Sequence, residues 1–188
     1  MRLFVAKQEY VLEFHDKVAD TILEIINQDI AEQDLVLCGF YIDGEEYYGD
    51  IFELMVNRGE SIQSVKAIVF TEKELKQDSI RSIQEYISNA LPLLSHLYND
   101  FYSTPSQKTW ENLGQLVEGL EWIGKAVEFI KSAGLHDFKK EVEDIAIAVS
   151  QQDTGLIGDL IQYEIIPRFE EMQDAVRAGA GGKSFDLN

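Results

Sequence analysis

The chain has 188 residues, with 16 Lys and Arg against 34 Asp and Glu, so its formal net charge is −18. Such a charge repels nucleic acid and anionic membrane surfaces, and the sequence therefore argues against both as partners. Hydrophobic residues make up 45% and charged residues 27%, which is typical of a globular domain and not of a disordered acidic tail.

The cysteine content and the hydropathy of the sequence predict the cellular compartment of the protein. The single cysteine, Cys38, excludes an internal disulfide and favours a reducing compartment. No stretch reaches the roughly 18 apolar residues that span a bilayer, and the first residues lack the apolar run and cleavage site of a signal peptide. We therefore expect a cytoplasmic protein.

The acidity is concentrated towards the two ends of the chain. Residues 1–60 carry a net charge of −10, residues 61–100 of −1 and residues 101–188 of −7. The densest cluster interleaves acidic residues with tyrosines: Tyr41, Asp43, Glu45, Glu46, Tyr47, Tyr48 and Asp50. One interpretation is a solvated turn. The other is a docking patch, because tyrosine is enriched at interfaces and acidic groups steer basic partners.

The first elements are expected to be a strand at residues 2–6 and a long helix from Glu9 to about Gln28. Six residues fall within one stripe of that helix: Val11, His15, Val18, Ala19, Ile22 and Ile26. The stripe predicts that His15 is a core or boundary histidine with one hydrogen bond. The alternative is a pH-sensing or ligand-binding role.

A β-hairpin is predicted around Asp43-Gly44, because a type I′ turn needs two residues with positive φ. The turn sets three cross-strand pairs: Ile42 with Glu45, Tyr41 with Glu46 and Phe40 with Tyr47. Strict alternation then puts one apolar set on a single face: Val36, Cys38, Phe40, Ile42 and Tyr47. On this face Cys38 is expected to be an inert, buried thiol.

Two further elements complete the first part of the chain. Residues 50–57 read as a strand or a short helix, and the helix is preferred because Asp50 can cap its start and Gly59 its end. Val65–Phe70 reads as a strand. The result is a small sheet of three or four strands that carries one long helix.

The rest of the chain reads as four helices. The first opens with a capping box at Thr71–Glu74 and continues through Pro92 with a kink. Its apolar stripe is Ile80, Ile83, Ile87, Ala90, Leu94, Leu97 and Phe101. On its polar face, His96, Asp100 and Glu85 are interpreted as surface residues and not as a metal site.

The second helix is expected to open with a capping box at residues 104–107 and to end at Gly134. Its three internal glycines, Gly114, Gly119 and Gly124, indicate a close approach by another helix or by a ligand, or a bend. A third helix is expected over residues 137–151. The fourth begins at Asp153 or Thr154 and keeps its apolar phase past Pro167.

The predicted fold is therefore α+β and mostly helical. A small N-terminal sheet, made of the hairpin, one or two more strands and one long helix, is expected to pack on a C-terminal antiparallel up-and-down bundle of four helices. The expected boundaries are residues 1–70 for the α+β region, 71–179 for the bundle and 180–188 for a flexible tail.

Searches for catalytic and metal-binding motifs are negative. No histidine has a glutamate three residues before it, as a di-metal bundle needs, and one cysteine with three scattered histidines makes a zinc site improbable. The sequence has no EF-hand spacing, dinucleotide fingerprint, P-loop or nucleophile elbow. We therefore assign no catalytic residue, no metal and no cofactor.

These observations favour a non-enzymatic adaptor or chaperone-like protein that docks a basic or amphipathic protein segment. The predicted interaction patch is Tyr41, Glu45, Glu46, Tyr47 and Tyr48. The alternative is a small-ligand binder or enzyme with an aromatic-lined pocket in the bundle, formed by Tyr98, Trp110, Trp122, Asp159 and Tyr163. A third alternative is a homodimer or larger homo-oligomer with a structural role.

Overall fold

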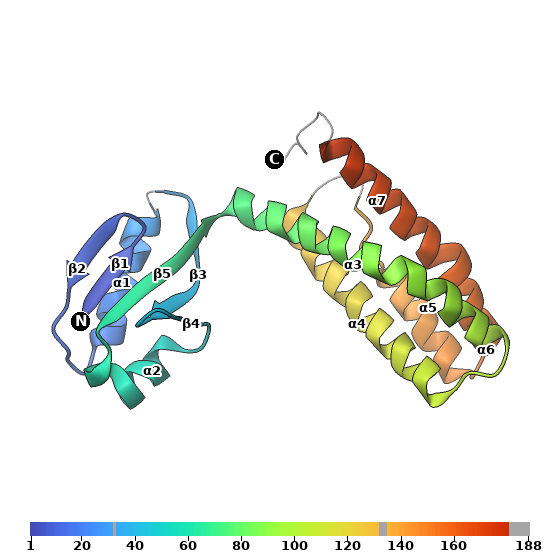
Figure 1. Ribbon diagram of the computed structural model, residues 1–188, viewed down its shortest axis with the longest axis horizontal. Coiled ribbons are helices and arrows are strands. Elements are labelled where there is room, and N and C mark those ends of the chain that lie inside the picture. The colour runs from blue at the N-terminus through green and yellow to red at the C-terminus, as the bar shows by residue number, and fades with distance from the viewer. Residues whose placement is uncertain (32, 132–134, 181–188) are drawn as a thin grey trace. The chain divides into compact units, whose positions relative to one another are not determined.

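The computed structural model describes residues 1–31, 33–131 and 135–180, and it divides into two compact units, Met1–Leu75 and Lys76–Asn188. The mostly helical α+β fold predicted from the sequence is confirmed. A sheet lies in the N-terminal unit, and helices build the C-terminal unit (Figure 1). Each unit has a hydrophobic core of its own.

The described residues of the N-terminal unit form a five-stranded sheet in the order β2-β1-β5-β3-β4, in which only β1 and β5 run parallel. Its elements are β1 (Arg2–Val5), β2 (Gln8–Val11), α1 (Val18–Ala31), β3 (Leu35–Ile42), β4 (Glu45–Tyr47), α2 (Ile51–Arg58), a 3₁₀ turn (Gly59–Ser61) and β5 (Ser64–Thr71). Helices α1 and α2 pack on one face of the sheet, around Leu3, Val5, Phe40, Ile42, Val65 and Ala67.

The helix predicted from Glu9 is wrong in its first part. Residues 8–11 form β2, which pairs with β1 through a two-residue turn in which Ala6 has φ 49°. Helix α1 begins only at Val18. His15 therefore lies in an exposed loop, outside any helical stripe and not in the core, and its Nδ1 accepts a hydrogen bond from Lys17 N at 3.2 Å.

The hairpin is confirmed with the predicted pairs, and its turn residues Asp43 and Gly44 both have positive φ, 51° and 94°. The predicted faces need a correction, because a bulge at Cys38 shifts the register between Leu37 and Gly39. The extra residue reverses the alternation before it. Val36 is consequently 41% exposed, while Leu37 packs against the core.

Cys38 is half-buried in this bulge and not fully buried as predicted. Its Sγ lies 3.7 Å from the carbonyl oxygen of Val36. Burial raises the pKa of the thiol, which lowers its thiolate fraction and its reactivity.

The capping signals at α2 and α3 are confirmed. The Asp50 carboxylate accepts a hydrogen bond from Phe52 N at 2.8 Å and caps α2. The region predicted as a strand or a short helix is therefore a helix. At the next helix, Glu74 N donates to the Thr71 hydroxyl at 3.1 Å and Thr71 N donates to the Glu74 carboxylate at 2.8 Å.

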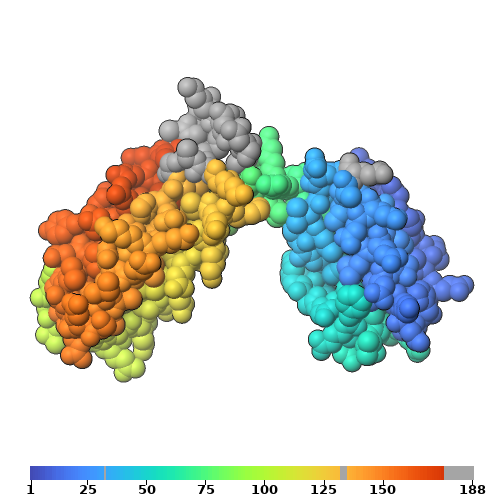
Figure 2. Space-filling model, turned by 180° about the vertical axis from the view of Figure 1, so that it is seen from behind, coloured from blue at the N-terminus to red at the C-terminus, as the bar shows by residue number. Residues whose placement is uncertain are grey.

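The bundle consists of α3 (Glu72–Tyr102), α4 (Gln107–Ile130), α5 (Lys139–Ser150) and a last, composite helix made of α6 (Thr154–Asp159), a π-helical segment (Leu160–Ile165) and α7 (Ile166–Ala180). Successive helices are linked at alternating ends, and α4 and α5 lie side by side on the face that Figure 2 shows in yellow and orange. As predicted, α3 continues through Pro92 and turns its apolar stripe into the bundle core.

Both ends of α4 differ from the prediction. The N-cap is Ser106, whose hydroxyl accepts from Thr109 N while the Thr109 hydroxyl accepts from Ser106 N. The Thr109 hydroxyl also donates to Asp100 at the end of α3, a partner that sequence spacing does not reveal. The helix ends at Ile130, with Lys131 in the left-handed conformation, and Gly134 lies outside the described residues.

The last helix begins at its predicted cap, Asp153, and its stripe is buried as far as Met172. The π-helical segment directly precedes Pro167. Proline has no N–H to donate to the carbonyl four residues earlier, and a wider turn upstream accommodates the missing bond. The tail predicted at 180–188 lies, from residue 181 onward, outside the described residues.

Candidate functional site

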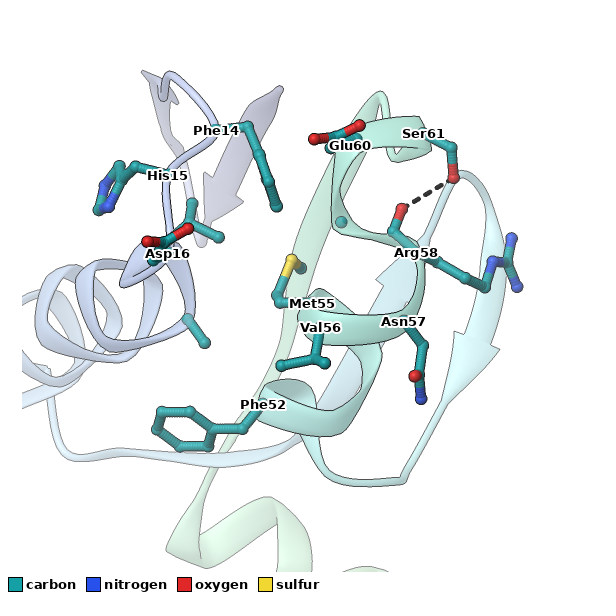
Figure 3. A pocket seen from close by; sticks show the side chains of 13 residues that line it. Phe14, His15, Asp16, Phe52, Met55, Val56, Asn57, Arg58, Glu60 and Ser61 are labelled. Carbon is teal, nitrogen blue, oxygen red and sulfur yellow. Dashed lines mark hydrogen bonds between the residues drawn. The ribbon is translucent and has the colours of Figure 1, made fainter.

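An open pocket of about 600 Å³ lies between helix α2 and the segment that leads into α1 (Figure 3). Three large apolar side chains line it and remain exposed: Phe14 at 40%, Phe52 at 42% and Val56 at 85%. Phe14 and Phe52 lie at opposite ends, with Met55 and Val56 between them. We call this pocket the α1–α2 groove.

The exposed side chains follow from the amphipathic pattern of α2. Ile51, Leu54 and Met55 turn into the core, whereas Phe52 and Val56, four residues apart, share the face beside the groove. The groove also depends on Gly59, because a Cβ at this position would overlap the Phe14 ring. Phe14, Phe52 and Val56 therefore form a cluster of exposed apolar side chains around one pocket.

The polar residues at the groove carry both signs of charge. Asp16 and Glu60 are acidic, Arg58 is basic, and His15 lies next to Asp16. The unit as a whole is strongly acidic, since residues 1–75 contain 16 Asp and Glu against six Lys and Arg, a net charge of −10. Its field therefore attracts basic ligands to a groove whose own lining is part polar and part apolar.

The predicted interaction patch divides between the two faces of the hairpin. Glu46 accepts hydrogen bonds from the hydroxyls of Tyr41 at 3.1 Å and Tyr48 at 2.9 Å, which brings these three residues together. These bonds are the largest cause of the raised pKa values of both tyrosines. Tyr47 packs against the core and donates to the carbonyl of Asp50, while Glu45 is exposed beside the turn.

Tyr41 and Glu46 continue a row of side chains across the face of the sheet opposite α1 and α2. The strand register places the members of this row beside one another: Glu9, Phe4, Lys66, Tyr41 and Glu46. The Lys66 Nζ lies 5.9 Å from the centre of the Tyr41 ring, a cation–π distance. Lys66 offsets one of the two carboxylates in the row, Glu9 and Glu46, which lowers the attraction of the row for a basic partner.

The five residues of the predicted aromatic pocket belong to three separate groups. Tyr98 packs edge-on against Tyr102, whose hydroxyl donates to Asp159 at 2.6 Å, and Tyr163 is 63% exposed on the same composite helix. Trp110 packs against Phe101 near the start of α4. Trp122 packs against Tyr86, about 18 Å further along that helix.

A buried acid and histidine form a pair that the search for sequence motifs misses. Glu141 is only 5% exposed, and its Oε1 lies 2.8 Å from His136 Nε2, while its Oε2 has no hydrogen-bond partner. His136 lies before the start of α5, so the two residues do not show the i, i+3 or i, i+4 spacing by which a helical pair is recognised in a sequence. Within the described ranges, no three His, Cys, Asp or Glu side chains gather as a metal site would require.

The described residues form a mostly helical α+β protein with an open groove in its N-terminal unit. Residues 78–175 match the family described as a domain of unknown function (DUF8042), and the chain belongs to this family. The match covers most of the bundle and none of the groove residues. No curated protein and no solved structure matches the chain. None of the helices described here is long and apolar enough to cross a membrane.

Proposed function

We propose that this protein is a non-enzymatic adaptor or chaperone-like protein, located in the cytoplasm, that docks a basic amphipathic segment of a partner protein in the α1–α2 groove. The observation that carries the proposal is the exposure of Phe14, Phe52 and Val56 around one pocket of a unit with a net charge of −10. Nucleic acid and anionic membranes are not its partners in this proposal, because the same charge repels them.

The chemistry of the groove specifies the partner. Its apolar side chains fit the apolar face of a helix, in the manner of helix-in-groove recognition. The basic residues on the opposite face of such a helix would gain from the acidic field of the unit, which mainly speeds association. Aromatic side chains in a partly enclosed site are typical anchors of binding energy.

Fluorescence anisotropy with two labelled model peptides tests the proposal. One peptide is an amphipathic helix of leucine and lysine, and the other has glutamate in place of each lysine. We expect the lysine peptide to bind more tightly than its counterpart, with an affinity that falls as salt is raised. Equal affinity for both peptides would refute the proposal.

Two matched variants locate the binding site. Val56→Asn removes an apolar group from the groove, and Val11→Asn changes a valine on β2 that is as exposed, 81% against 85%. We expect Val56→Asn to weaken binding of the lysine peptide about tenfold and Val11→Asn to leave it unchanged. If the pair Glu45→Lys and Glu46→Lys abolishes binding while Val56→Asn does not, the hairpin patch and not the groove is the docking surface.

A small-ligand binder or enzyme with an aromatic pocket in the bundle is the weaker alternative, because its five residues belong to separate groups. A thermal-shift screen with common metabolites, cofactors and metals tests it. A ligand that raises the melting temperature of both wild type and Val56→Asn would support a second site and would leave the peptide experiment to decide on the groove.

A further inference from the structure

The exposed face of helix α3 carries no formal charge between Glu85 and Asp100. Residues 86–99 contain no Asp, Glu, Lys or Arg, in a chain of which 27% is charged. Seven of these 14 residues are exposed: Ser88, Asn89, Pro92, Leu93, Ser95, His96 and Asn99. Leu93 is 66% exposed. Solvated helix faces normally carry charges, whereas the centres of protein interfaces are depleted of them.

A groove of about 450 Å³ between α3 and α4 adjoins this face. Its apolar lining includes Ala90, Leu93 and Leu116, and its polar lining is mostly amide. The amides come from both helices: Asn89, Asn112 and Gln115. Asp100 is its one residue with a formal charge, and it already accepts a hydrogen bond from the Thr109 hydroxyl at 3.2 Å.

We propose that this face binds the same face of a second copy of the chain across a two-fold axis. In such a contact every residue meets the same surface, so a charged face would repel itself and an uncharged face would not. Two copies that each carry −18 can approach most easily where neither presents charge. Residues 86–99 extend about 21 Å along α3, which gives the contact its length.

The side chains of the face are suited to meeting their own copies. Asn and Gln amides both donate and accept hydrogen bonds, so Asn89, Asn112 and Gln115 can pair with amides of the second copy, which carboxylates cannot do. Leu93 projects beside the small residue Ala90. A leucine of one copy can therefore fill the groove of the other, and the symmetry repeats this contact.

The proposal goes beyond the docking function and predicts the opposite dependence on salt. Docking of a basic segment by an acidic unit weakens as salt screens attraction, whereas pairing of two acidic copies strengthens as salt screens repulsion. Sedimentation velocity on the full chain, from about 1 µM to 1 mM at two salt concentrations, should show a dimer whose fraction rises with protein concentration and with salt.

Leu93→Glu places a carboxylate in the proposed contact of both copies and should weaken the dimer at least about tenfold. The matched control is Ile147→Glu on α5, a site that is 51% exposed and outside the groove, which should leave the dimer unchanged. Circular dichroism confirms that each variant is folded. If Leu93→Glu is not, Asn89→Asp carries the same test with a smaller change.

Three results would overturn the proposal. The first is a monomer at every concentration and both salt levels. The second is a dimer that persists in the folded Leu93→Glu or Asn89→Asp variant. The third is a dimer that weakens as salt is raised. None of them bears on peptide binding at Val56, so the two proposals fail independently.

Discussion

Two glycines of α4 form a matched pair that tests the packing of the bundle. The ring of Tyr86 lies against Gly119, and a Cβ on this glycine would overlap the ring and its hydroxyl. Gly114, five residues earlier in the same helix, has no neighbouring atom within 4 Å of the Cβ that alanine would add. The substitutions Gly119→Ala and Gly114→Ala therefore differ in packing but share the same change in helix propensity.

The magnitude follows from what Tyr86 contacts. Its ring packs against Trp122 and Phe169, each with ring centres 6.2 Å apart. Losing both aromatic pairs costs about 1–3 kcal/mol, and exposing part of the ring adds about 1 kcal/mol. Alanine in place of glycine returns about 1 kcal/mol of helix propensity. Gly119→Ala should thus destabilise the bundle by about 1–3 kcal/mol, whereas Gly114→Ala should stabilise it by up to about 1 kcal/mol.

Urea unfolding followed by tryptophan fluorescence measures the difference. Both tryptophans, Trp110 and Trp122, lie on α4, so the signal reports on the bundle and not on the N-terminal unit. In a Tyr86→Ala background the overlap is gone, and Gly119→Ala should then stabilise as Gly114→Ala does. If Gly119→Ala stabilises the wild-type protein as well, the ring of Tyr86 does not lie where the reasoning requires.

Two further predictions concern titrating groups. Hydrogen bonds from Thr71 N and the Thr71 hydroxyl lower the pKa of Glu74, so they stabilise the fold above the unfolded pKa and cease to do so as pH falls through the lowered value. Thr71→Ala should return the carboxyl pKa part of the way to its ordinary value in an NMR titration, and an unchanged pKa would contradict this. The bond to Asp159 is the main cause that raises the pKa of Tyr102 to about 12, so its stabilisation is complete below the unfolded pKa and is lost as pH rises through the folded one. Asp159→Asn should lower this pKa towards 10 in a phenolate absorbance titration referenced to Tyr102→Phe, and a value still near 12 would show that another group sets it.

Local sequence signals predicted the elements whose cause is local. The hairpin at Asp43-Gly44 and the capping box at Thr71–Glu74 form as expected, because each depends on backbone angles and hydrogen bonds within a few residues. The stripe of α3 follows for the same reason, since helical periodicity is fixed by 3.6 residues per turn.

The wrong predictions concern elements whose conformation depends on residues distant in the chain. Residues 8–11 show a helical period but become β2, because β1 offers partners for their backbone groups. The bulge at Cys38 depends on how β3 pairs with β5, almost 30 residues later in the chain, and it reverses the position of Val36. Ser106 and not Thr104 caps α4, and the capping residue Thr109 is tied to Asp100 of another helix.

The candidate sites show the same division. Sequence reasoning found Tyr41, Glu46 and Tyr48, which lie close together in the hairpin. It missed the α1–α2 groove. Phe14 and Phe52, separated by 38 positions, line the same pocket only when α2 packs beside the segment leading into α1. The spacing of Phe52 and Val56 is the sequence signal that could have indicated the groove. These two apolar residues lie four apart on the side of α2 that faces away from the core.

The sequence by itself determined the charge of −18, the α+β character and the helical spacing of the bundle. Composition and local geometry suffice for these properties. The net charge is a sum over all residues, and the secondary-structure signals depend on residues close together in the chain. Tertiary structure alone decided which apolar side chains stay exposed and which polar groups pair, including Glu141 with His136. A residue is buried or exposed only relative to elements that the chain brings beside it, and no local pattern encodes that choice.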